Sequence, residues 1–124
     1  MDVKIDTKEK FHEISVLEHE LTANMTAGAT SFLSGLLEKP VKNVILLLNK
    51  VNNVELGFAE SLVELQASFY EQGASFVICG LQPAVRKMLD EAELLEIMNT
   101  TPTLSEAWDI VQMEEIEREL LGDD

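Results

Sequence analysis

An uninterrupted run of aliphatic residues at 44–48, Val-Ile-Leu-Leu-Leu, constrains the fold of this chain more than any other feature. A strand with one face in water alternates apolar and polar residues, because successive side chains point to opposite faces of the sheet. A run without alternation is typical of a strand covered on both faces. We therefore expect residues 44–48 to form the central strand of a sheet.

A helix and a second buried strand follow this run. The segment 76–79, Phe-Val-Ile-Cys, is again uniformly apolar, and Gly73 before it is a suitable C-cap for the intervening helix. Pro83 suits the first turn of the next helix. The apolar face of the first of these helices consists of Phe58, Leu62, Leu65 and Phe69, with Ala59 and Val63 beside them. Its polar face consists of Glu60, Glu64, Ser68 and Glu71. The second helix turns Val85, Met88, Leu89 and Ala92 inward.

The N-terminal part predicts a hairpin and one helix. Val3 and Ile5 alternate with charged residues, and Ile14 and Val16 repeat the alternation after a polar turn at 7–10. The helix ends before Pro40, because proline cannot continue the hydrogen-bond ladder. Its apolar side consists of Met25, Ala29, Phe32, Leu33, Leu36 and Leu37.

The last helix begins at a capping box formed by Thr103 and Glu106. Its inward stripe consists of Leu104, Ala107, Trp108 and Val111, which Met113, Ile116 and Leu120 can continue. Residues 113–124 are either a helical extension packed on the domain or an acidic tail for a basic partner. We expect a helix that frays after Leu121.

Length and composition narrow the class of protein. A chain of 124 residues is the usual size of one domain. The 23 acidic and 9 basic residues give a formal charge of −14, which argues against a nucleic-acid groove. Solubility explains this charge more simply than a specific electrostatic role such as binding a basic partner. The lone Cys79 lies in an apolar strand, so we expect a buried thiol in a reducing cytoplasm. We find neither a signal peptide nor an apolar run long enough for membrane insertion.

Residues for enzyme chemistry are scarce. His12 and His19 have no cysteine or further histidine nearby, so we interpret them as surface or rim histidines and expect no metal site. The chain has no phosphate-binding glycine loop, no nucleophile elbow and no cysteine with a plausible base. We therefore expect no catalytic residues and no cofactor.

The ordered set of elements resembles the STAS domain of anti-sigma factor antagonists. The likeness spans nearly the whole chain, and we expect one STAS-like domain over residues 1–124. It rests on NVILLLNKVNNVE at 43–55, SFVICGLQPAVRKML at 75–89 and Ser-Glu-Ala at 105–107. It implies a single α/β domain with a mixed, mostly parallel sheet flanked by about four helices. In that family the turn after the central strand carries Asp-Ser-Ser-Gly or Asp-Thr-Ser-Gly. Aligned on Val51, Glu55 takes the aspartate position, Leu56 and Gly57 the hydroxyl positions and Phe58 the glycine position.

This alignment predicts that the usual phosphosite is lost, since Leu56 occupies the serine position and has no hydroxyl. No Ser, Thr or Tyr occurs from Lys50 through Glu60, and we interpret the nearby Ser61 as a packing or backbone-bonding residue. Glu55 either holds a permanent negative charge beside the free amides of the helix start or simply favours the helix dipole. The resemblance implies that this turn and helix bind the partner. The expected partner-binding residues are Glu55, Leu56, Gly57, Phe58, Glu60, Ser61 and Glu64.

Three functions fit this pattern. The first is a partner-switching regulator that binds a serine-kinase-like anti-sigma factor and acts without being phosphorylated. The second is an accessory STAS subunit on the ATPase of a lipid-transport complex. The third is a structural module, for example a homodimer, in which a second subunit covers Leu56 and Phe58.

Overall fold

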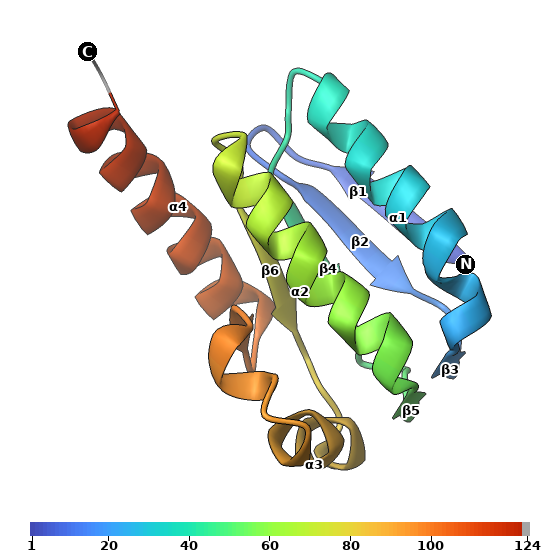
Figure 1. Ribbon diagram of the computed structural model, residues 1–124. Helices are drawn as coiled ribbons and strands as arrows, with labels where there is room; N and C mark the ends of the chain where they lie inside the picture. Colours follow the sequence, from blue (N-terminus) through green and yellow to red (C-terminus); the bar gives the residue numbers. More distant parts are fainter. Residues whose placement is uncertain (123–124) are drawn as a thin grey trace.

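A five-stranded sheet in the order β1-β2-β4-β6-β7 forms the centre of the protein. The computed structural model describes residues 1–122. β1 is antiparallel to β2, and the other three pairings in this sheet are parallel. With four α-helices around it, this sheet confirms the predicted α/β fold (Figure 1). The strands of the sheet are β1 Val3–Thr7, β2 His12–Val16, β4 Val44–Leu47, β6 Phe76–Cys79 and β7 Thr100–Thr101.

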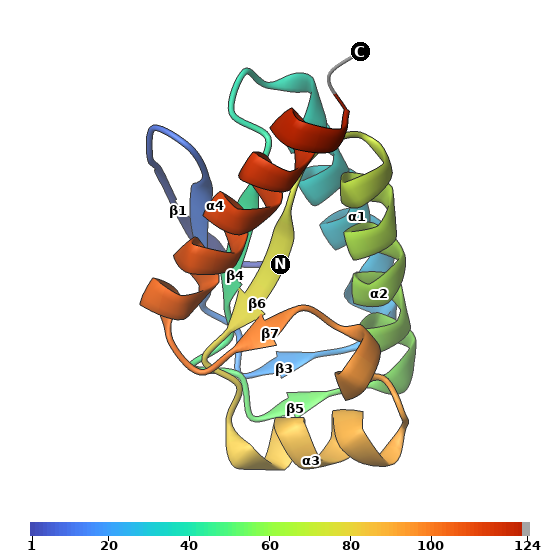
Figure 2. The same ribbon diagram turned by 90° about the vertical axis from the view of Figure 1, so that its left-hand side faces the viewer.

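The helices cover both faces of the sheet, as the apolar run at 44–48 predicted. α1 (Thr26–Gly35) and α2 (Leu56–Glu71) lie on one face, and α4 (Leu104–Leu121) lies on the other (Figure 2). β4 is the central strand, and Val44 and Ile45 within it are completely buried. The larger core cluster lies under α1 and α2, and a smaller one that includes Ala107 and Val111 lies under α4.

The predicted helix ends are confirmed. α2 is followed by Gly73 at a φ of 75°, a conformation that glycine adopts without a Cβ penalty. α3 (Pro83–Glu91) has its proline in the first turn. At the start of α4 the Thr103 hydroxyl oxygen accepts a hydrogen bond from the Glu106 amide at 3.2 Å, which is one half of the predicted capping box. The Glu106 carboxylate accepts from the Thr103 hydroxyl at 2.9 Å and not from the Thr103 amide, so the other half is not formed. Local sequence chemistry therefore places these boundaries.

Three very short strands were not predicted. β3 (Glu20–Leu21) pairs in parallel with β5 (Asn53–Val54) in a separate sheet, and β7 adds an edge to the main sheet. Each is two residues long, too short for any periodicity. β5 of this small sheet leads directly into α2 (Figure 2).

His12 corrects the prediction of a surface or rim histidine. Its side chain is buried, and its two ring nitrogens lie 2.9 Å from the Thr7 hydroxyl and 2.8 Å from the Val41 carbonyl oxygen. A buried imidazole needs such partners because an unpaired polar group away from water is costly. His12 therefore joins the β1–β2 hairpin to the segment before β4.

The C-terminal half of α4 corrects a second prediction. Met113, Ile116 and Leu120 are exposed and do not continue the inward stripe of the helix. The physical reason is helical geometry, since Met113 follows Val111 by two residues and thus by about 200° of rotation. The prediction of a helix is confirmed through Leu121, while residues 123–124 of the expected tail lie outside the described part of the chain.

Within residues 1–122, no helix has the length and apolar character needed to cross a bilayer.

Candidate functional site

The candidate site lies where the short β3–β5 sheet leads into α2. β5 ends at Val54, Glu55 is the extended N-cap residue, and Leu56 is the first residue of the helix. The Glu55 amide donates to the Leu21 carbonyl oxygen at 2.8 Å, and its own carbonyl oxygen accepts from Ala59 at 3.0 Å. Backbone hydrogen bonds therefore hold the turn on both of its sides.

The Glu55 carboxylate is bonded to a segment distant in sequence. Its Oε1 accepts a hydrogen bond from the Ala23 amide at 2.6 Å, and it makes no side-chain cap bond to α2. Ala23 opens the short 3₁₀ helix Ala23–Met25 that leads into α1. The sequence analysis predicted that the Glu55 carboxylate acts at the N-terminus of the helix that it precedes, α2. The structure adds that this carboxylate caps the preceding helical segment, which couples the starts of α1 and α2.

Leu56 and Gly57 lie on the surface of the turn. Half of the Leu56 side chain, 51%, is exposed, although leucine is among the residues that folding most often buries. Gly57 is exposed as well, and a Cβ there would lie 3.3 Å from the Cβ of Ala23. The absence of a side chain at Gly57 thus lets α2 approach the start of α1 closely.

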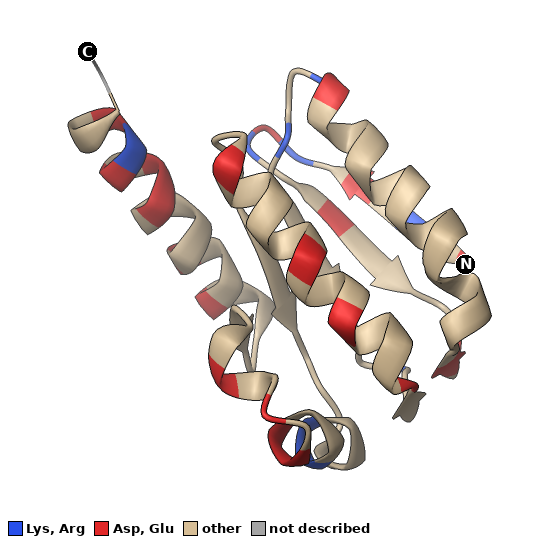
Figure 3. Ribbon diagram, viewed as in Figure 1, with Lys and Arg blue, Asp and Glu red and all other residues tan. Residues whose placement is uncertain are grey.

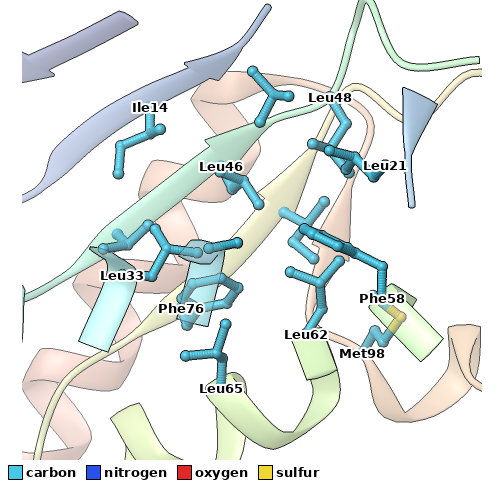
Figure 4. Close-up of a cluster of buried hydrophobic side chains, with 14 of the residues drawn as sticks. Ile14, Leu21, Leu33, Leu46, Leu48, Phe58, Leu62, Leu65, Phe76 and Met98 are labelled. Atoms are coloured by element: carbon cyan, nitrogen blue, oxygen red, sulfur yellow. The ribbon is translucent and has the colours of Figure 1, made fainter. Parts of the chain in front are cut away.

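Two of the expected partner-binding residues have buried side chains. Phe58 is 1% exposed and points into the cluster with Leu62 and Met98 (Figure 4). Ser61 is 7% exposed, and its hydroxyl donates to the Phe58 carbonyl oxygen at 2.6 Å. The helical period of α2 turns both residues toward the sheet. Their side chains therefore support the site from below, and the interpretation of Ser61 as a backbone-bonding residue is confirmed.

Glu60 and Glu64 extend the exposed part of the site along α2. Both are exposed, and a spacing of four residues places them one turn apart on the same face. Acidic residues follow this outer side of α2 in Figure 3. We refer to Leu56, Gly57, Glu60 and Glu64 as the α2 surface. It combines one apolar side chain with negative charge, which suits a protein partner.

Outside the α2 surface, the residue types that could support chemistry are the metal-ligating side chains and Cys79. Within residues 1–122, no group of three His, Cys, Asp or Glu side chains is arranged to hold a metal ion. Cys79 is buried under α4, and this burial, together with the negative charge of Glu13, raises the pKa of its thiol to about 11. A thiol with a raised pKa is a poor nucleophile at neutral pH.

A family model gives the clearest comparison with known proteins. The model of the STAS domain matches residues 7–107, which include β2 and all later strands, the first three α-helices and the start of α4. No curated protein matches the chain in sequence.

Solved structures share the fold at low sequence identity. An anti-sigma factor antagonist (STAS) domain protein from Planctomyces limnophilus is 21% identical, with a TM-score of 0.74 over 90% of this chain and 99% of that one. An anti-sigma factor antagonist from Mycobacterium paratuberculosis is 14% identical, with a TM-score of 0.75 over 90% and 93%. The murine anion transporter Slc26a9 is 15% identical, with a TM-score of 0.62 over 83% of this chain but 18% of the transporter. At these identities the likeness establishes the fold.

Proposed function

Because the chain belongs to the STAS domain family, we propose that it is a protein-binding regulator of the anti-sigma factor antagonist kind. In this proposal the α2 surface binds a serine-kinase-like anti-sigma factor in the cytoplasm. The observation that carries the proposal is the half-exposed Leu56 at the first position of α2. When a partner covers an exposed leucine, the burial of its apolar surface stabilises the complex.

The contacts around Leu56 favour binding over chance exposure. Glu55 is bonded to both Leu21 and Ala23, and Phe58 anchors the first turn in the core. A surface that is rigid before binding loses little conformational entropy on association. The α2 surface therefore has the preorganisation expected of a docking site.

The same residues support action without phosphorylation at the usual site. Leu56 has no hydroxyl, and Ser61, the nearest hydroxyl along α2, is buried with its proton donated to the Phe58 carbonyl oxygen. Ser61 is therefore a poor kinase substrate in the folded protein, because its hydroxyl is buried and hydrogen-bonded. We propose that the amount of this protein, and not its modification, sets the signal.

A second candidate function is an accessory subunit of a transporter. What supports it is the fold match to 18% of the chain of Slc26a9, an anion transporter, in which the matching part belongs to the transporter chain itself. In that case the α2 surface, or another face of the domain, binds the ATPase of a transport complex. Self-association through Leu56 is the remaining alternative.

Affinity capture from the native cells tests these alternatives. The tagged protein is compared with a Leu56→Lys variant, which replaces the apolar side chain of the α2 surface with a positive charge. A Tyr70→Lys variant is the matched control, because Tyr70 is 65% exposed at the other end of the same helix. We expect a kinase-like anti-sigma factor to be captured with the wild-type protein and with Tyr70→Lys, but not with Leu56→Lys.

Other outcomes reject the proposal in distinct ways. Capture of a transporter ATPase supports the accessory-subunit function, and recovery of the protein alone, as a dimer that Leu56→Lys dissociates, supports the structural module. The phosphorylation claim has its own test with the captured kinase and ATP. The wild-type protein should take up no phosphate, whereas Leu56→Ser should be phosphorylated at the introduced serine. Phosphate on Ser61 of the wild type contradicts this claim.

A further inference from the structure

The two halves of α4 contact the sheet in different ways. The first half packs through apolar side chains, with Ala107 and Val111 completely buried. In the second half the positions that face the domain are Glu114, Glu115 and Arg118, which follow Val111 at the helical spacings of three, four and seven residues. Their side chains are polar, so the helix changes character halfway along its length.

Hydrogen bonds connect this polar half to the residues that immediately precede β4, β6 and β7. The Glu114 carboxylate accepts from the Ser75 hydroxyl at 2.6 Å and from the side-chain nitrogen of Asn99 at 3.1 Å. Glu115 accepts from the Asn43 side chain at 2.9 Å, and Arg118 donates to the Ser75 hydroxyl oxygen at 3.2 Å. The polar inner face thus holds the C-terminal half of α4 against the domain and leaves its outer face without a structural role.

The outer face carries an apolar stripe. Met113, Ile116 and Leu120 are 62%, 55% and 78% exposed. Their spacing of three and four residues aligns them on one side of the helix over about 10 Å. This side is opposite to Ala107 and Val111, and the spacing is that of the contact positions in a helix pair. Nothing within residues 1–122 covers the stripe.

The charges beside the stripe select the kind of partner. Glu117 and Glu119 are exposed on its two sides, and acidic residues mark this part of α4 in Figure 3. A second copy of the chain would bring carboxylates against carboxylates, in addition to its own formal charge of −14. A helix with Lys or Arg beside its apolar positions would instead pair with these carboxylates.

We propose that the outer face of α4 binds an amphipathic helix of another protein, whose apolar stripe is flanked by basic residues. This surface is separate from the α2 surface, since α2 and α4 lie on opposite faces of the sheet (Figure 2). The proposal does not depend on the identity of the partner at Leu56.

A titration followed by NMR tests the proposal on the full chain. The probe is a synthetic amphipathic helix of leucine and lysine, compared with a scrambled peptide of the same composition and with a leucine–glutamate helix. We expect chemical-shift changes confined to residues 109–121 with the leucine–lysine helix. Its affinity should exceed that for each comparison peptide by about tenfold or more.

Variants separate the apolar stripe from general negative charge. Ile116→Asp should weaken binding about tenfold, whereas Ser105→Asp, with the same added charge on an exposed position earlier in α4, should change it by less than about twofold. A Glu117→Lys and Glu119→Lys double variant should reverse the preference toward the leucine–glutamate helix.

Two results overturn the proposal. The first is equal binding of the scrambled peptide, which assigns the effect to charge alone. The second is a dimer of the free chain in sedimentation that Ile116→Asp dissociates, which assigns the stripe to self-association.

Discussion

The start of α2 and the outer face of α4 both expose apolar side chains beside carboxylates, but they are supported differently. At the start of α2, exposed Leu56 is two residues from buried Phe58, so surface and core share one turn. In α4 the exposed stripe lies above polar contacts such as that between Glu114 and Ser75. A change at Phe58 in the α2 turn therefore risks the fold, whereas a change in the α4 stripe affects the surface alone.

The largest expected difference in the free energy of unfolding is between two variants of the α2 turn. Phe58→Ala should lower the free energy of unfolding by about 3–5 kcal/mol, because it removes a completely buried ring from the main core. Leu56→Ala should change it by less than about 0.5 kcal/mol. Urea unfolding of the two variants measures both values. A cost of Leu56→Ala close to that of Phe58→Ala would contradict the exposure of Leu56.

Substitutions on the two sides of α4 should differ less in their effect on the free energy of unfolding. Val111→Ala should cost about 2 kcal/mol, since it deletes buried methyl groups from the smaller core cluster. Ile116→Ala on the exposed side should stay within about 0.5 kcal/mol of the wild type. Thermal or urea unfolding at low protein concentration checks the pair. If Ile116→Ala is as destabilising as Val111→Ala, the stripe is covered in the free protein.

The smallest expected effect concerns the bond that joins the starts of α1 and α2. Glu55→Ala removes the acceptor for the Ala23 amide and should cost about 1–2 kcal/mol. Glu55→Gln keeps an acceptor oxygen without the charge and should cost less. Amide hydrogen exchange should accelerate at Ala23 in both variants, more strongly in Glu55→Ala. Unchanged exchange at Ala23 would show that the bond does not stabilise the turn.

Local patterns in the sequence predicted most of the fold. The unbroken apolar run before Asn49 placed β4 at the centre, and Gly73, Pro83 and Thr103 marked where helices end or begin. These signals are strong because backbone chemistry imposes them within a few residues. The exposed carboxylates of α2 at Glu60, Glu64 and Glu71 followed from the same periodicity, whereas the exposure of Leu56 did not.

The sequence was less informative where a contact joins distant segments. The partner of the Glu55 carboxylate is 32 residues away, and the two-residue strands β3 and β5 that bring the segments together have no pattern of their own. The burial of His12 is compensated by a hydrogen bond to the Val41 carbonyl oxygen, 29 residues later in the chain. The exposure of Met113 was in part predictable, since counting turns from Val111 places it outside.

The sequence by itself thus determined the order of the four longer strands and the four α-helices, the central strand and the domain family. Only the tertiary structure decided that Glu55 caps another helical segment and that polar contacts hold the second half of α4. The physical reason is the range of the interactions. Periodicity and capping depend on near neighbours in the chain, whereas a hydrogen bond between distant residues forms only when the packed sheet brings them together.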